Sequence, residues 1–478
     1  MRPDFATRLE RAVRRGLRAG ASGLLVAVVA GGLLADAAVA QHDVPLVFVE
    51  FDPGDYGLAR ATDVRRGRVS LAWHSDGVRL NPYYLRSDPV PPRVTYPDAP
   101  PLPDPDLPDA RATRETALWV WQTARIMRDA DERAAFLDFV EAQGITRVFL
   151  HLAWAEGDAP RAGFTPFSGE EIGPLIADLR ARGALTYGLD GDPDFVREEN
   201  HAGVWRTVER MVEYNRSAPE EQRFYGIRYD IEPYLVPGFQ GPFRQRYLDA
   251  YVRLLGGVSR IGRAAGLRVA VDIPFWFDAP DEESGIYMEA TLDGRRAGML
   301  DQILGLVDDI AIMDYRTEPM GANGALAHSY HELELAEAVG VDVFVGVETV
   351  PLVDEDLHTF FGPFDEGLPP HSDARWIVLE ERSDGRGRLW LVDGAAQLAE
   401  VRERSADAVS IRYWPAGRPI RVGADAQSFH NLGPDAMRSV TNEIIRYLSV
   451  EPAFAGLAFH DYYGLRELLG RREGDVRD

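Results

Sequence analysis

The sequence predicts an α/β protein built around a (β/α)8 TIM barrel. From residue 116 onward, short apolar runs rich in β-branched residues alternate with amphipathic helical patterns, which is typical of βα units around a parallel sheet. Eight strand and helix pairs of this kind can be counted along the chain. Glycines stand just before several of the strands, where the C-cap of the preceding helix belongs: Gly144, Gly183, Gly266 and Gly340.

The apolar runs give the expected positions of the barrel elements. Strands are expected at 117–121, 145–152, 185–189, 225–231, 267–277, 310–315, 341–347 and 454–459. Helices are expected at 131–143, 170–182, 204–214, 243–265, 294–306, 325–339, 435–448 and 465–471.

The N-terminus has the three-part pattern of an export signal, expected over residues 1–40. An arginine-rich stretch precedes the apolar run 21–40, which closes on an Ala-Val-Ala triplet before Gln41. An uncleaved membrane anchor is the alternative, because the run is nearly long enough to span a bilayer. Two glycines interrupt the run and Asp36 charges its end, which favours cleavage. We therefore expect a secreted or periplasmic protein with no stable membrane insertion after signal cleavage.

Two further segments are expected outside the barrel. Residues 41–112 read as a small β accessory segment followed by a proline-rich linker, because β-like runs precede a stretch dense in proline. The catalytic barrel is expected over 113–472, interrupted at 355–430 by an inserted β-containing unit. A structureless loop of that length would be unusual.

The composition excludes several chemistries. The chain of 478 residues has no cysteine, and its 52 basic residues are all arginine. There is thus no thiolate nucleophile, no cysteine zinc site, no Schiff-base lysine and no P-loop lysine. The net charge of −24 argues against nucleic acid as a partner.

Acidic residues gather at the expected carboxyl ends of the strands, where a barrel of this type carries its reactive groups. Alternation places Arg228, Asp230 and Glu232 on one face of the fourth strand. If that face is the interior, we expect Arg228 to hold Asp230 ionised and Glu232, nearer the opening, to donate a proton. An inert buried Arg–Asp pair is the structural alternative.

The run from Phe224 to Glu232 resembles the strand-four signature of glycoside hydrolase family 18, the chitinase-like barrels, whose pattern is Asp-Gly-x-Asp-x-Asp-x-Glu. Gly226, Asp230 and Glu232 match that pattern, whereas Tyr225 and Arg228 stand where the first and second aspartates would be. Further matches are Met313-Asp314-Tyr315 on the sixth strand, Gly346 on the seventh and Gly456 on the eighth, while His460 stands near the family's strand-eight tryptophan.

The resemblance implies a secreted enzyme that cleaves glycosidic bonds of a polysaccharide. It implies a general acid at Glu232, with Asp230 and Tyr315 contacting a substrate acetamido group. If the substrate lacks that group, Asp272, Asp314 or Glu348 would have to act as nucleophile or base. Aromatic residues beside carboxylates suit a carbohydrate site. The catalytic candidates are Glu232, Asp230, Tyr315 and Asp314, and the substrate-binding candidates are Arg228, Trp121, Asp272, Trp276, Arg316, Glu348, His460 and Tyr463.

No cofactor and no metal are expected, but two alternatives stay open. One is a non-catalytic carbohydrate-binding barrel, for which the altered signature is the reason. The other is a metal-dependent hydrolase or lyase, and no paired-histidine spacing at a strand end specifies its ligands. Its oxygen and nitrogen ligands would come from His151, Asp190, Asp230, Asp272, Asp314, Glu348 and His460.

Overall fold

A computed structural model describes most of the chain. It covers residues 26–28, 46–51, 66–74, 77–81, 85–86, 114–152, 169–236, 239, 244–278, 288–321, 323–361, 365–370, 374–416 and 420–471. The expected export signal lies outside these residues apart from the short strand β1 (Val26–Val28), and the proline-rich linker lies outside them entirely. None of the helices in the described part of the chain combines the length and the apolar character that a membrane span requires.

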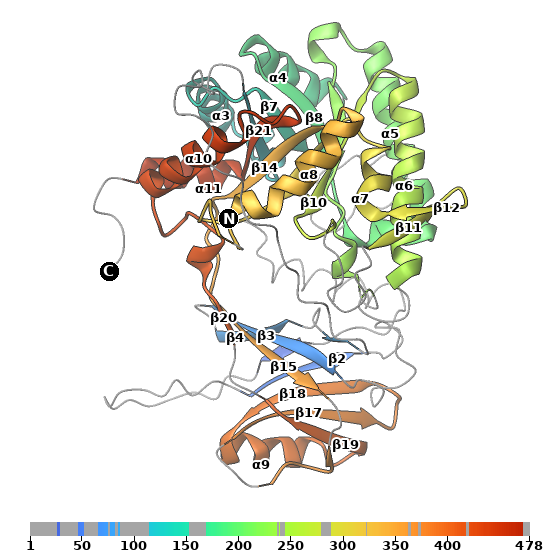
Figure 1. Ribbon diagram of the computed structural model, residues 1–478, viewed down its shortest axis with the longest axis vertical. Helices are drawn as coiled ribbons and strands as arrows, with labels where there is room; N and C mark the ends of the chain where they lie inside the picture. Colours follow the sequence, from blue (N-terminus) through green and yellow to red (C-terminus); the bar gives the residue numbers. More distant parts are fainter. Residues whose placement is uncertain are drawn as a thin grey trace. The chain divides into compact units, whose positions relative to one another are not determined.

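Eight parallel strands close into a barrel, which confirms the predicted fold class (Figure 1). Neighbours around the barrel follow the order β6, β7, β8, β9, β10, β13, β14 and β21, and β21 pairs with β6 to close the ring. The strands are β6 (Glu115–Val120), β7 (Arg147–His151), β8 (Leu185–Asp190), β9 (Gly226–Tyr229), β10 (Arg268–Pro274), β13 (Asp309–Met313), β14 (Asp342–Glu348) and β21 (Phe454–His460).

Helices follow the barrel strands in the sequence, as predicted. The glycines expected to end helices, Gly144, Gly183, Gly266 and Gly340, all have the left-handed backbone conformation that such a cap needs. The helices are α2 (Thr123–Arg128), α3 (Ala130–Ala142), α4 (Gly169–Ala181), α5 (Glu198–Ser217), α6 (Arg244–Ala264), α7 (Met299–Leu304), α8 (Ala325–Val339), α10 (Pro434–Leu448) and α11 (Tyr462–Gly470). The 3-10 turns are η5 (Pro193–Val196), η6 (Glu220–Gln222), η7 (Pro233–Leu235) and η8 (Ala424–Ala426).

One predicted helix is wrong over half of its length. Residues 294–306 were expected to be helical, but only α7 is, and a hairpin of β11 (Glu289–Leu292) and β12 (Arg295–Gly298) precedes it. The hairpin turns on Asp293 and Gly294, whose φ angles are 50° and 79°. An Asp-Gly pair accommodates two successive positive φ angles, which is the geometry of a two-residue type I′ turn.

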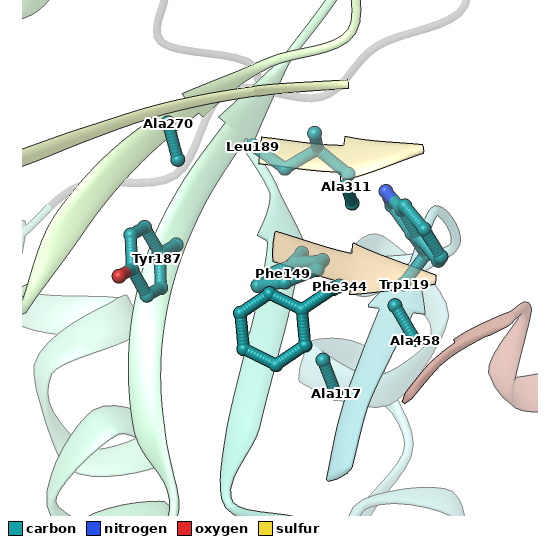
Figure 2. Packing of buried hydrophobic residues seen from close by; sticks show 9 residues of the cluster. All are labelled: Ala117, Trp119, Phe149, Tyr187, Leu189, Ala270, Ala311, Phe344 and Ala458. Atoms are coloured by element: carbon teal, nitrogen blue, oxygen red, sulfur yellow. The ribbon is translucent and has the colours of Figure 1, made fainter. Parts of the chain in front are cut away.

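Aromatic and small side chains fill the interior of the barrel (Figure 2). Phe149 packs edge-to-face against Tyr187, Phe344 and Trp119, with ring centroids 5.6, 6.2 and 5.4 Å apart. The cluster is completed by Leu189 and by four alanines, Ala117, Ala270, Ala311 and Ala458. Alanine positions beside large rings leave room in this layer for a further long side chain.

The remaining described strands form a second, smaller unit. Its six-stranded sheet has the order β1, β2, β18, β17, β19, β16, and its five-stranded sheet contains β20, β15, β3 and β4, with β5 paired to β3. The elements not yet defined are β2 (Val47–Phe51), β3 (Arg66–His74), β4 (Gly77–Asn81), β5 (Leu85–Arg86), β15 (Glu355–Phe361), β16 (Asp365–Glu366), β17 (Arg375–Arg382), β18 (Gly387–Asp393), α9 (Gly394–Arg404), β19 (Ala408–Pro415) and β20 (Ile420–Val422).

The accessory segment and the insertion, which were expected as separate segments, are joined by strand pairing. β2 pairs with β18 and β3 pairs with β15, so segments about 300 residues apart in the chain share both sheets. The buried Phe48 of β2 packs on Trp390 of β18 with ring centroids 4.4 Å apart. The two segments therefore belong to one folding unit.

Candidate active site

Arg228 occupies the centre of a buried charge network in the barrel. Its guanidinium donates to Asp272 Oδ1 on β10 at 2.5 Å and pairs with Asp309 on β13, and it lies 4.0 Å from the centroid of the Phe149 ring. Burial opposes its charge, but Asp272 and Asp309 outweigh that effect and raise the pKa of Arg228. The carboxylates that Arg228 contacts thus come from the two strands that follow β9 around the barrel, and the expected effect of Arg228 on the ionisation of Asp230 stays a prediction.

The same network fixes Asp272. Its second oxygen, Oδ2, accepts a hydrogen bond from Trp119 Nε1 at 2.9 Å, and the residue is 1% exposed. Burial raises the pKa of this carboxyl, while Arg228 and the Trp119 N–H oppose the shift. Arg228 itself has no exposed surface, so it cannot contact a substrate in this structure. Its position is that of a residue that orients Asp272.

A second network joins the ends of β14, β21 and β6. Glu348 and His460 are register partners on adjacent strands, and His460 Nδ1 lies 2.9 Å from Glu348 Oε2. The other nitrogen, Nε2, lies 2.9 Å from Trp121 Nε1. Glu348 Oε1 accepts from the backbone N–H groups of Thr349 and Val350, both at 2.9 Å. Three of the predicted site residues are thus brought together.

Tyr315 belongs to the same group. Its ring stacks on His460 with centroids 5.5 Å apart and an interplanar angle of 22°. Gly346 on β14 provides the space, since a Cβ atom there would lie 3.3 Å from Tyr315 Cε1 and 2.5 Å from the carbonyl oxygen of Ile312. Trp119 packs edgewise on His460 at 5.7 Å, and so connects this group with the Arg228 network.

Asp230 and Glu232 follow β9 directly, at its carboxyl end, and both are half-buried. The backbone N–H of Asp230 donates to the carbonyl oxygen of Asp190 at 3.0 Å, which extends the pairing of β8 and β9 to this residue. Burial and then the charges of Asp230 and Asp272 raise the pKa of the Tyr251 phenol on α6, so both carboxylates act on one buried hydroxyl. Glu232 stands between Asp230 and the turn η7.

The expectation that Asp314 takes part in catalysis is contradicted by its contacts. Asp314 is 1% exposed, and its two oxygens are 3.0 Å from His328 Nδ1 and from Ser329 Oγ, both on α8. Asp314 and Tyr315 follow β13, which ends at Met313; Tyr315 stacks on His460, whereas the Asp314 carboxylate contacts α8.

The three other predicted residues lie in different surroundings. Tyr463 on α11 packs against the Arg125 and Arg466 guanidinium groups, 4.8 and 5.3 Å from its ring centroid. Arg316 lies 4.5 Å from the centroid of Phe275 and donates to Asn323. Trp276, after β10, meets Phe277 edge-to-face at 5.2 Å. All three follow barrel strands at the carboxyl end: Trp276 follows β10, Arg316 follows β13 and Tyr463 follows β21.

Several residues of the two networks were not predicted from the sequence. Asp309 was not singled out, although it accepts from Tyr187 at 2.7 Å as well as pairing with Arg228. Trp119 was not among the predicted site residues either, and its N–H donates to Asp272. Asp309 opens its strand at the amino end, where acids are not expected to be functional, and no local pattern marks it as a partner of Arg228. Within the described residues, no group of three or more His, Asp or Glu side chains is placed to hold a metal ion.

The chain resembles solved structures of chitinases and of glycoside hydrolase family 18 enzymes, at low identity. A chitinase from Chromobacterium violaceum ATCC 12472 has 13% identity and a TM-score of 0.36, over 75% of this chain and 100% of that one. A family 18 N-acetylglucosaminidase from Paenibacillus barengoltzii has 11% identity and a TM-score of 0.36, over 74% of this chain and 98% of that one. The spore cortex-lytic enzyme SleL of Bacillus cereus has 11% identity and a TM-score of 0.34, over 73% of this chain and 70% of that one.

No protein-family model and no curated protein sequence matches the chain. Similarity at this level says nothing about which residues of this chain act chemically.

Proposed function

We propose that the chain is a glycoside hydrolase-like enzyme that cleaves glycosidic bonds of a polysaccharide, with Glu232 as the general acid. One observation carries the proposal. Carboxylates follow β9 at the carboxyl end of a closed eight-stranded barrel, and at that same end the half-buried rings of Trp121 and Tyr315 gather around His460. Aromatic rings beside a proton donor suit the apolar faces and the bridging oxygen of a carbohydrate.

The contacts of the other carboxylates narrow the mechanism. Asp272 is held by Arg228 and Trp119, Asp314 by α8, and Glu348 has both oxygens hydrogen-bonded. None of the three carboxylates is therefore placed to attack a sugar carbon or activate a water. Of the carboxylates that remain at this end of the barrel, Asp230 is the one that follows β9 together with Glu232, and we assign it the second role.

This arrangement favours a substrate that carries its own acetamido group. In the proposed reaction, Glu232 donates its proton to the bridging oxygen as the bond from that oxygen to the anomeric carbon breaks. The acetamido oxygen forms a bond to the anomeric carbon, with Asp230 and Tyr315 holding the group. Glu232, now ionised, takes a proton from the water that opens this intermediate.

The test is cleavage of acetylated and deacetylated polysaccharides by the wild type and by Glu232→Gln. We expect release of reducing ends from the acetylated polymer, and its loss in Glu232→Gln with an unchanged melting temperature. The matched control is Glu337→Gln, which neutralises an exposed carboxylate on α8 and should leave cleavage unchanged. Full activity of Glu232→Gln would contradict the proposal.

A non-catalytic carbohydrate-binding barrel is the second candidate. Arginine stands at position 228, where the signature has an aspartate, and the structure ties it to Asp272 and Asp309. A barrel that keeps its aromatic rings and loses a carboxylate of its signature would bind glycans without turning them over. Binding on a glycan array, together with no cleavage of any bound glycan, would establish this function instead.

We further propose that the mature chain is exported and begins at Gln41, so that cleavage removes the edge strand β1 from its place beside β2. The arginine-rich start, the apolar run and the Ala-Val-Ala triplet support this reading. N-terminal sequencing of the protein recovered outside the cytoplasm should give the sequence that starts at Gln41, and recovery of the full-length chain in the membrane fraction would contradict it.

A further inference from the structure

The pair Glu348 and His460 is unusually well fixed. The residues face each other across β14 and β21, and Glu348 is 3% exposed. Glu348 Oε1 is fixed by two backbone N–H groups, which leaves Oε2 to accept from His460 Nδ1 at 2.9 Å. The carboxylate therefore has one orientation, and the imidazole is oriented by it.

The hydrogen-bonding chemistry of Trp121 determines the tautomer of the neutral His460 imidazole. An indole N–H can only donate, so His460 Nε2, 2.9 Å from Trp121 Nε1, must be the acceptor. The proton of the neutral imidazole is then on Nδ1, where it is donated to Glu348. This is one of two tautomers, and the carboxylate selects it. Glu348 thus controls, through His460, whether the indole N–H of Trp121 has an acceptor.

Two aromatic rings depend on this imidazole. Trp121 is oriented by its hydrogen bond to Nε2, and Tyr315 is stacked on the ring at 5.5 Å. Trp121 and Tyr315 are half-buried, as is His460, whose side chain is 12% exposed. Both aromatic rings therefore keep surface that a ligand can contact.

We propose that Glu348 and His460 are positioning residues that hold Trp121 and Tyr315 as a platform for the apolar face of a sugar ring. The inference rests on the proposed function for the nature of the ligand. It replaces the expectation that Glu348 and His460 contact substrate themselves. Orientation of the indole before binding reduces the entropy lost when the sugar docks on it.

Glu348→Gln is the sharpest variant because it keeps the shape and changes only the hydrogen-bonding pattern. If the new amide oxygen accepts from Thr349 and Val350, its NH2 group faces His460 Nδ1. The imidazole proton must then move to Nε2, where it faces the Trp121 N–H. If the amide is reversed, its NH2 group faces two backbone donors. The reversed amide opposes two backbone donors and the first arrangement opposes only one, so we expect the first arrangement, in which Trp121 loses its acceptor and its fixed orientation.

A second pair of variants separates positioning from packing. His460→Gln retains one acceptor for Trp121 and one donor for Glu348, and it should preserve much of the effect. His460→Leu fills similar space with neither. The control for the charge change is Glu403→Gln, an exposed position on α9 in the smaller unit.

The measurements are the nuclear magnetic resonance signal of the Trp121 indole N–H and the steady-state constants for a cleaved oligosaccharide. The indole signal is assigned by its loss in Trp121→Phe. We expect Glu348→Gln and His460→Leu to shift the signal and to raise KM by roughly tenfold, the effect of one hydrogen bond, with a smaller change in kcat. His460→Gln should stay closer to the wild type, and Glu403→Gln should match it.

The outcomes separate this proposal from the proposed function. The indole signal needs no substrate, so an unmoved signal in Glu348→Gln overturns the positioning role whatever the enzyme cleaves. A moved signal with unchanged KM overturns the platform. A moved signal in a protein that neither binds nor cleaves any carbohydrate retains the positioning of Trp121 and overturns the proposed function.

Discussion

Replacing Arg228 by methionine should destabilise the barrel strongly. The guanidinium has no exposed surface, and the two carboxylates it neutralises, Asp272 and Asp309, are each 1% exposed. Removing one partner from a buried ion network leaves uncompensated charge and costs about 3–5 kcal/mol. A change of 1 kcal/mol shifts the melting temperature of a large domain by roughly 2–4 °C, so we expect a fall of roughly 6–20 °C.

The matched control also removes the two carboxylate charges that Arg228→Met leaves without their guanidinium partner. In the triple variant Arg228→Met, Asp272→Asn, Asp309→Asn, the asparagine oxygens can still accept from Trp119 and Tyr187, and none of the three charges of this network remains. Thermal unfolding followed by calorimetry should find the triple variant more stable than Arg228→Met alone. A loss below about 1 kcal/mol in Arg228→Met, the range of exposed ion pairs, or a triple variant that is less stable than the single one, would refute the reasoning.

Two other predictions concern the helix α8. Asp314→Asn should lower the stability of the protein, because it weakens the contacts with His328 and Ser329. Since we expect no catalytic role for Asp314, kcat should stay within about threefold of the wild-type value. A loss of kcat of about a hundredfold, the lower end of the range for a general acid or base, would instead show that Asp314 takes part in catalysis. Burial, and then the neighbouring Asp278, raise the pKa of the fully buried Glu332 well above its ordinary value. The folded state therefore favours the protonated carboxyl, and its stabilising effect is present below pH of about 4.3 and lost as pH rises through the folded-state pKa. Glu332→Gln should be more stable than the wild type at neutral pH, and the two proteins should be equally stable in acid. A difference in melting temperature between the two proteins that is the same at every pH would contradict this prediction.

The barrel could be predicted from the sequence because the patterns that indicate its strands and helices are local. Each strand is an apolar run and each helix an amphipathic one, and the capping glycines mark the boundaries. The hairpin at Asp293 and Gly294 was missed although its signal was present, since an Asp-Gly pair between short β-like runs favours a two-residue turn. The smaller unit was divided wrongly because nothing local shows that β2 and β18 pair across more than 300 residues.

The candidate site was predicted in part. In the expected strand 310–315, alternation already places Asp314 and Tyr315 on opposite faces, which argued against both acting in one site. The partners of Arg228 were not predictable in this way, since Asp272 and Asp309 reach it from two other strands. Which acid pairs with a buried arginine depends on how the strands are staggered around the barrel, and the sequence of one strand does not contain that information.

The most direct test of acid catalysis by Glu232 compares two leaving groups on the same sugar. In Glu232→Gln, cleavage of an oligosaccharide, whose departing sugar hydroxyl needs a proton, should fall by about 10² to 10⁴-fold. Cleavage of the same sugar linked to dinitrophenol, whose anion departs unaided, should fall by less than about tenfold. Equal losses on the two substrates, or no loss on the oligosaccharide, would contradict the account.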